Sequence, residues 1–184
     1  MPEWDPERVV DPDLARALIQ ARVPELAAAP INRLAEGWDN VVYLVDGRWV
    51  FRFPQREIAV PGVRREIATL ERIGPHLPLP VPVPRWVGGD DEGYPWPWFG
   101  TEHLPGVELA AARLPDEQRV GVGQAVGAFL RALHGPMLRS RIAASLPIDP
   151  MRRTDMPHRV RLTRDRLSRV TDAGLWRPTA EVDA

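Results

Sequence analysis

The dipeptide Asp46-Gly47 stands between two runs of β-branched and aromatic residues, and it constrains the fold of this chain more than any other feature. The two runs are residues 41–45 and residues 48–53. Asp and Gly accept the positive φ angles of a tight turn, so this arrangement is typical of a β-hairpin. Pro54 ends the second run, because proline cannot donate a backbone hydrogen bond to a neighbouring strand. We therefore predict two antiparallel strands joined at Asp46-Gly47.

Apolar spacing predicts the elements on either side of this hairpin. Residues 11–26 predict a helix with Asp11 as its N-cap. Residues 63–73 carry apolar side chains at helical spacing and predict a second helix. The remaining predicted elements are strands at 31–34, 85–87 and 98–103 and helices at 115–134 and 152–177. Because all the predicted strands lie before residue 105 and only helices follow them, the predicted fold class is α+β, with a boundary near Pro105-Gly106.

Composition narrows the environments and partners of the protein. The 184 residues carry a formal net charge of −1, so no whole-molecule field attracts the chain to nucleic acid or to an anionic membrane. The absence of cysteine excludes disulfide bonds, thiolate chemistry and cysteine-ligated zinc. No stretch approaches the roughly 20 apolar residues of a membrane span. We expect a cytoplasmic protein with neither nucleic acid nor membrane as a partner.

Glu66 is the first candidate functional residue. On a helical wheel it falls within the apolar face of the predicted helix 63–73. A carboxylate on a buried face is costly unless a cation meets it. Two interpretations stay open: Glu66 stands at the edge of the apolar stripe and reaches solvent, or it pairs with a cation.

Arg52 is the candidate cation. In the predicted strand 48–53, alternation places the aromatic residues on one face and Val50 with Arg52 on the other. Arg52 either extends its charged end into solvent from an exposed face or meets Glu66. A strand cation paired with a helix carboxylate is the arrangement with which kinases hold the phosphates of a nucleotide.

A set of short motifs occurs in a fixed order along roughly residues 30 to 135. They are Gly37-Trp38-Asp39-Asn40, Val50-Phe51-Arg52-Phe53-Pro54, Arg65-Glu66, Glu102-His103-Leu104-Pro105-Gly106 and Phe129-Leu130-Arg131-Ala132-Leu133-His134. In order and approximate spacing they resemble the aminoglycoside phosphotransferase family, which includes kinases similar to choline kinase. The usual strand cation of that family is Lys, whereas this chain has Arg52 and contains no lysine.

The resemblance implies the architecture. It predicts a protein-kinase-like amino-terminal lobe (N-lobe), a five-stranded antiparallel sheet plus a helix, followed by a truncated helical carboxy-terminal lobe (C-lobe). The expected divisions are an N-terminal helical extension at 1–30, the N-lobe at 31–104, and a linker with the first C-lobe helices at 105–184.

The resemblance also implies a nucleotide site. Arg52 would contact the phosphates, Glu66 would orient Arg52, and Val50 would pack against the base. The carbonyl of Glu102 and the N–H of Leu104 would read the edge of the base. Thr101 would line the back of the pocket, and the turn from Gly37 to Asn40 would cover the phosphates.

The catalytic part of the family pattern is missing from these residues. The family has His-Gly-Asp followed by Asn, and later an Asp that binds metal, whereas here His134 is followed by Gly135-Pro136. Asp155 and Asp165 stand in no comparable setting. We therefore assign no catalytic and no metal-binding residue, although ATP or GTP with Mg²⁺ is expected for full-length relatives.

The predicted function is the nucleotide-binding part of a kinase that transfers the γ-phosphate to a small-molecule hydroxyl, inactive alone because its catalytic loop is absent. The alternative is a non-catalytic nucleotide-binding or protein-interaction module. We also expect an exposed apolar patch around Phe129 and Leu133, through which the chain self-associates. The arginine-rich segment 159–169 is interpreted as a solvated helix face.

Overall fold

The computed structural model describes residues 5–90, 93–142, 148–149 and 152–177. The chain divides into two compact units, Met1–Pro147 and Ile148–Ala184, and each is described by itself. The first unit contains the sheet and most of the helices, and the second contains a single described helix, α6.

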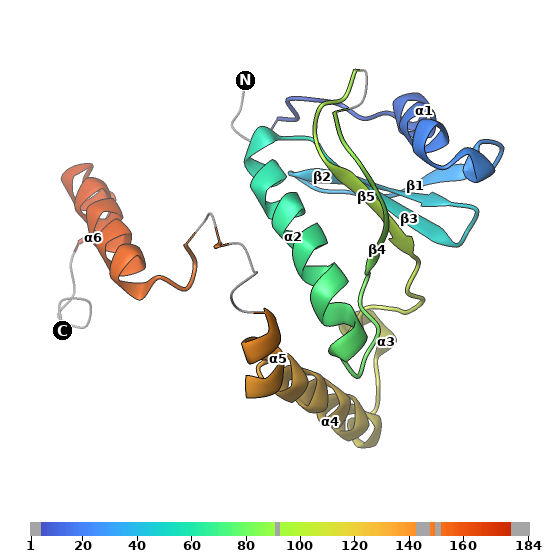
Figure 1. The fold of residues 1–184 in the computed structure, drawn as a ribbon. Helices are drawn as coiled ribbons and strands as arrows, with labels where there is room; N and C mark the ends of the chain where they lie inside the picture. Colours follow the sequence, from blue (N-terminus) through green and yellow to red (C-terminus); the bar gives the residue numbers. More distant parts are fainter. Residues whose placement is uncertain (1–4, 91–92, 143–147, 150–151, 178–184) are drawn as a thin grey trace. The chain divides into compact units, whose positions relative to one another are not determined.

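The first unit is built on a five-stranded antiparallel sheet with the order β1-β2-β3-β5-β4 (Figure 1). The strands are β1 (Ile31–Glu36), β2 (Asn40–Val45), β3 (Trp49–Pro54), β4 (Pro84–Gly88) and β5 (Trp98–Glu102). The predicted hairpin is confirmed, because β2 pairs with β3 and sets Val45 opposite Trp49. Asp46 and Gly47 both adopt positive φ, as the turn requires. The α+β class and the five-stranded sheet are thereby confirmed.

One face of the sheet carries the hydrophobic core, and we call it the core face. Trp49, Phe51 and Phe53 of β3 are buried on it, beside Tyr43 of β2 and Trp98 of β5. Strand alternation explains this, because every second residue of β2 and β3 is buried. The aromatic rings contact one another edge-on or tilted, as between Phe53 and Trp98 at 5.2 Å between centroids.

Helix α1 (Pro12–Arg22) contributes to this core. The predicted N-cap is confirmed, since the amide of Leu14 donates to Oδ1 of Asp11 at 2.8 Å. The helix ends at Arg22, earlier than predicted, because Pro24 lacks an N–H and disfavours the helical conformation at Val23. A short 3₁₀ helix, η1 (Pro24–Leu26), covers the rest of the predicted segment.

Buried tyrosines tie irregular segments to the sheet. The hydroxyl of Tyr43 donates to the carbonyl of Val10 at 2.8 Å, and the hydroxyl of Tyr94 donates to the carbonyl of Pro54. Burial raises the pKa of both phenols, which further favours the protonated form that donates these hydrogen bonds. These bonds hold the segment before α1 and the end of β3 in place.

Helix α2 (Val60–Ile73) follows β3 after a short 3₁₀ helix, η2 (Glu57–Ala59). It begins before the predicted residue 63 because Val60 and Pro61 occupy its first turn, where a missing proline N–H costs nothing. Its buried residues are Val60, Val63 and Ile73. A third 3₁₀ helix, η3 (Gly74–His76), leads into the extended proline-rich segment before β4.

Among the described residues of the first unit, helices alone follow β5, as predicted. They are α3 (Leu109–Ala112), α4 (Asp116–Leu133) and α5 (Pro136–Ile142). Gly135-Pro136 ends α4 as predicted, but Pro136 also begins α5, which the sequence analysis did not resolve. None of the described helices is long and apolar enough to cross a membrane.

The predicted apolar patch around Phe129 and Leu133 on α4 is exposed in part. No residue of α4 is buried, but Phe129 and Leu133 are half-buried. The exposed large apolar residues are Val120, Val126 and Leu130. Of these, Val126 and Leu130 lie beside Phe129 along the helix, and Val120 lines the groove between η3 and α4.

Helix α6 (Met156–Asp172) is shorter than the predicted 152–177. It starts where Oδ1 of Asp155 accepts a hydrogen bond from the amide of His158 at 3.0 Å. That bond, with help from Arg152, holds the pKa of Asp155 below its usual value. The arginines at 161, 164, 166 and 169 are exposed, in agreement with a solvated face.

The close packing of β5 on β3 can be tested at Gly100. A Cβ atom there would lie 2.4 Å from Cε1 of Phe51, which is fully buried and has no room to move. We expect Gly100→Ala to lower the free energy of unfolding by about 1–3 kcal/mol. Urea denaturation measures this, and Gly106→Ala is the control, since a Cβ at that position would meet nothing within 4 Å. An equal, small effect of both substitutions would contradict the packing.

Candidate functional site

The ion pair between Arg52 and Glu66 is the centre of the candidate site. Nη1 of Arg52 donates to both carboxylate oxygens of Glu66, at 3.0 Å and 2.9 Å. The predicted pair is therefore confirmed, and the open alternatives, in which either side chain only reaches solvent, are wrong. Both side chains are about one-third exposed, at 35% and 31%, so the pair lies at the wall of an open cleft.

Local structure explains how these two residues meet. Arg52 lies on β3 between Phe51 and Phe53, so alternation turns it away from the core face. Glu66 lies on the side of α2 that turns toward the sheet, as the helical wheel predicted. We call this second side of the sheet the cleft face.

The cleft face and the elements beside it enclose a cleft of about 590 Å³. Residues from β2, β3, β5, α2, the turn before β2 and the segment before β4 line it. They are Gly37, Trp38, Asp39, Asn40, Val42, Val50, Arg52, Glu66, Pro82, Phe99 and Thr101. The register explains the set, because Val42 and Phe99 lie opposite Arg52, and Thr101 lies opposite Val50. The structure thus brings six of the predicted site residues into one cleft.

The turn from Gly37 to Asn40 forms one wall of the cleft. The amide of Gly37 donates to the carbonyl of Asn40 at 2.9 Å and closes the turn. The side chain of Trp38 is largely exposed, at 78%. Oδ1 of Asn40 is buried and has no hydrogen-bond partner in the described part of the chain.

Glu102 and Leu104 are the predicted residues that do not line the cleft. Glu102 ends β5, and its exposed carboxylate accepts a hydrogen bond from Arg48 at 3.3 Å. Leu104 follows the strand and is 39% exposed. Their predicted roles use backbone atoms, and these roles stay predictions.

Several cleft residues were missed by the sequence analysis. Asp39 and Trp38 lie inside the predicted turn but were not singled out, and Val42 shares the alternation of β2. Phe99 follows from the alternation that identified Thr101, so that signal was available. Pro82 was not predictable, because only the path of the segment before β4 brings it to the cleft.

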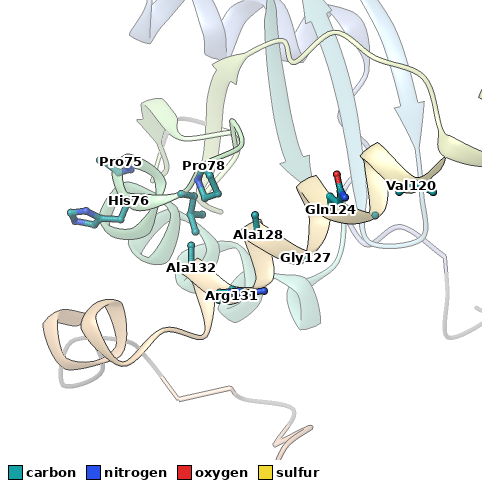
Figure 2. Close-up of a pocket in the computed structure, with 11 residues that line it drawn as sticks. Pro75, His76, Pro78, Val120, Gln124, Gly127, Ala128, Arg131 and Ala132 are labelled. Carbon is teal, nitrogen blue, oxygen red and sulfur yellow. The ribbon is translucent and has the colours of Figure 1, made fainter. Parts of the chain in front are cut away.

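A larger open groove of about 1190 Å³ lies between η3 and α4 (Figure 2). Pro75, His76 and Pro78 form one side, and small residues of α4 such as Gly127 and Ala128 form the other. Its lining contains no pair of opposite charges and no nucleophile beside a base. Size alone therefore does not make it a candidate site.

The carboxylates that line the cleft are already paired with arginines and do not form a metal site. No group of three or more His, Asp or Glu side chains gathers into such a site among the described residues. Glu66 and Asp39 line the cleft, but Arg52 and Arg56 pair with them. We therefore assign no metal ligand in this part of the chain.

A comparison with known protein families identifies the family of this chain. The model of the phosphotransferase enzyme family (APH) matches residues 30–178, most of the sequence. The chain belongs to this family. The match spans the sheet, the cleft and the helices that follow, as the motif resemblance predicted. No curated protein sequence matches the chain.

Solved structures of aminoglycoside phosphotransferases share the fold. The GDP and kanamycin complex of APH(2")-IIia has a TM-score of 0.63 at 24% identity, over 74% of this chain and 46% of that one. The gentamicin complex of APH(2")-IIa has a TM-score of 0.64 at 13% identity, over 92% and 53%. ADP-bound APH(2'')-Ib has a TM-score of 0.55 at 16% identity, over 91% and 53%. The chain thus spans about half the length of these proteins.

The ion pair is expected to position Arg52 rather than to stabilise the fold. A pair whose side chains are about one-third exposed is screened by solvent, so its coupling free energy should be about 0.2–1 kcal/mol. A double-mutant cycle with Arg52→Ala, Glu66→Ala and the double variant, followed by urea unfolding, measures this value. A coupling above about 2 kcal/mol would show a buried structural pair instead.

Proposed function

We propose that the cleft binds the nucleotide of a kinase that phosphorylates a small-molecule hydroxyl. The observation that carries this proposal is the Arg52–Glu66 pair at the wall of a cleft that is otherwise largely apolar. A strand cation held by a helix carboxylate suits the phosphates of a nucleotide. The fold class that this chain shares with aminoglycoside phosphotransferases supports the same interpretation.

The geometry of Arg52 favours a phosphate ligand. Both contacts with Glu66 use Nη1. Within the described part of the chain, the other nitrogens of the guanidinium keep their donors for a ligand in the cleft. Guanidinium groups bind phosphate oxygens with strong, charge-assisted hydrogen bonds. Glu66 fixes the direction of the group and so reduces the entropy that binding would cost.

The apolar part of the cleft suits a planar base. Val42, Val50 and Phe99 line it, and Thr101 adds a hydroxyl at its back. We propose that the carbonyl of Glu102 and the N–H of Leu104 bind the edge of the base from the end of β5. Two of the similar structures named above hold GDP or ADP, so both ATP and GTP belong in the test.

Nucleotide binding by residues 1–184 is the first test. We expect weak binding of ATP or GTP, and we expect Arg52→Ala to lower that affinity about tenfold or more, because a charge-assisted phosphate contact is lost. The affinity for adenosine should not change. Calorimetric titration measures both, with Arg16→Ala as control, since Arg16 lies on α1 and donates to the carbonyl of Ala29. Absence of any nucleotide binding would refute the proposed function.

Phosphoryl transfer by these residues is the second test. Catalysis depends chiefly on metal ions and on a positioned acceptor hydroxyl, and the 184 residues contain no His-Gly-Asp sequence. We expect no nucleotide consumption above background with Mg²⁺ and a panel of aminoglycosides. Turnover that survives rigorous purification and disappears in Arg52→Ala would overturn this expectation. Binding without turnover is also the outcome that a non-catalytic module would give, and a longer reading frame with His-Gly-Asp would distinguish the two.

A further inference from the structure

Gln55 and Arg56 follow β3 directly and lie behind the turn that forms one wall of the cleft. Neither residue lines the cleft. Gln55 is 2% exposed, and the side chain of Arg56 is 13% exposed. Buried polar side chains are costly unless they are used, so their contacts define what they hold in place.

Gln55 and Arg56 contact the turn at Asp39, and Gln55 also contacts Glu36, the residue just before it. The amide of Gln55 donates to the carbonyl of Asp39 at 2.7 Å, and Nη1 of Arg56 donates to Oδ1 of Asp39 at 3.0 Å. The side-chain amide of Gln55 donates to Oε1 of Glu36 at 3.3 Å, just before the turn. The turn contains only Gly37 as a flexible residue, so bonds from behind can hold it in one conformation.

The segment that carries Gln55 and Arg56 is itself held. The carbonyl of Gln55 accepts hydrogen bonds from the amides of Glu7 and Arg8, at 2.9 Å and 3.0 Å. The preceding carbonyl, of Pro54, accepts the hydroxyl of buried Tyr94. The turn is therefore braced against the hydrophobic core and not only closed by its own hydrogen bond.

Arg56 also has an electrostatic effect on the cleft. Asp39 lines the cleft, and its side chain is 48% exposed. An unpaired carboxylate there would repel the phosphates that Arg52 attracts. The guanidinium of Arg56 compensates that charge from the side away from the cleft.

We propose that Gln55 and Arg56 are positioning residues that hold the turn from Gly37 to Asn40 over the phosphates and neutralise Asp39. The proposal rests on the proposed nucleotide function of the cleft. It extends the site to residues that touch no ligand.

The proposal is tested by comparing how Arg56→Ala changes the affinity for ATP and the affinity for adenosine. A released turn and an uncompensated Asp39 should weaken ATP binding about fivefold or more and leave adenosine binding within about twofold. Arg56→Lys should recover part of the loss, because it restores the charge but not the planar geometry of the guanidinium. The matched control is Arg16→Ala, which removes another partly buried arginine and should change neither affinity.

Amide hydrogen exchange tests, without any ligand, whether Arg56 holds the turn from Gly37 to Asn40 in one conformation. In Arg56→Ala the amide of Gly37, which closes the turn, should exchange at least about fivefold faster, while amides of β2 and β3 keep their protection. An equal loss of ATP and adenosine affinity, or unchanged exchange at Gly37, would overturn the proposal. If the unaltered chain binds no nucleotide, the proposed function fails, and the exchange result still decides whether Arg56 holds the turn.

Discussion

Pairing of β2 with β3 in the register that sets Val45 opposite Trp49 decides what each face of the sheet contains. A slip of one residue would exchange the faces of β3, turning Phe51 into the cleft and Arg52 into the hydrophobic core. The positive φ angles at Asp46 and Gly47 specify the turn, and the turn specifies the register. The core and the candidate site thus depend on the same short hairpin.

The core also supports the site through the segment that leaves β3. Phe53 packs in the core, Pro54 accepts the hydroxyl of Tyr94, and Gln55 and Arg56 then reach the turn beside the cleft. The packed aromatic cluster therefore restrains the segment that leaves β3, and this segment restrains one wall of the cleft. The Arg52–Glu66 pair has the opposite character, since its partial exposure leaves it little stabilising value and suits it to bind an anion.

Features with a short-range cause could be predicted from the sequence. The hairpin, the Asp11 N-cap and helix α2 each follow from turn chemistry, capping or apolar spacing within a few residues. The Arg52–Glu66 pair could also be predicted from the sequence. The helical wheel placed the carboxylate of Glu66 on an apolar face, and strand alternation placed the cation of Arg52 on the face away from the aromatic residues. The predicted helix boundaries were wrong at two prolines, because a proline can end one helix and begin the next. Pro24 ends α1 earlier than predicted, and Pro136 both ends α4 and begins α5.

The sequence by itself determined the local conformations and the alternation of side chains, because these depend on backbone sterics and on neighbours close in the chain. Only the tertiary structure decided that β5, and not β4, lies beside β3, and therefore that Phe99 and Thr101 face the cleft opposite Arg52 and Val50. It also decided that Arg56 meets Asp39 and that Phe129 and Leu133 are half-buried. Such contacts join segments far apart in the chain, and their free energy depends on how whole elements pack.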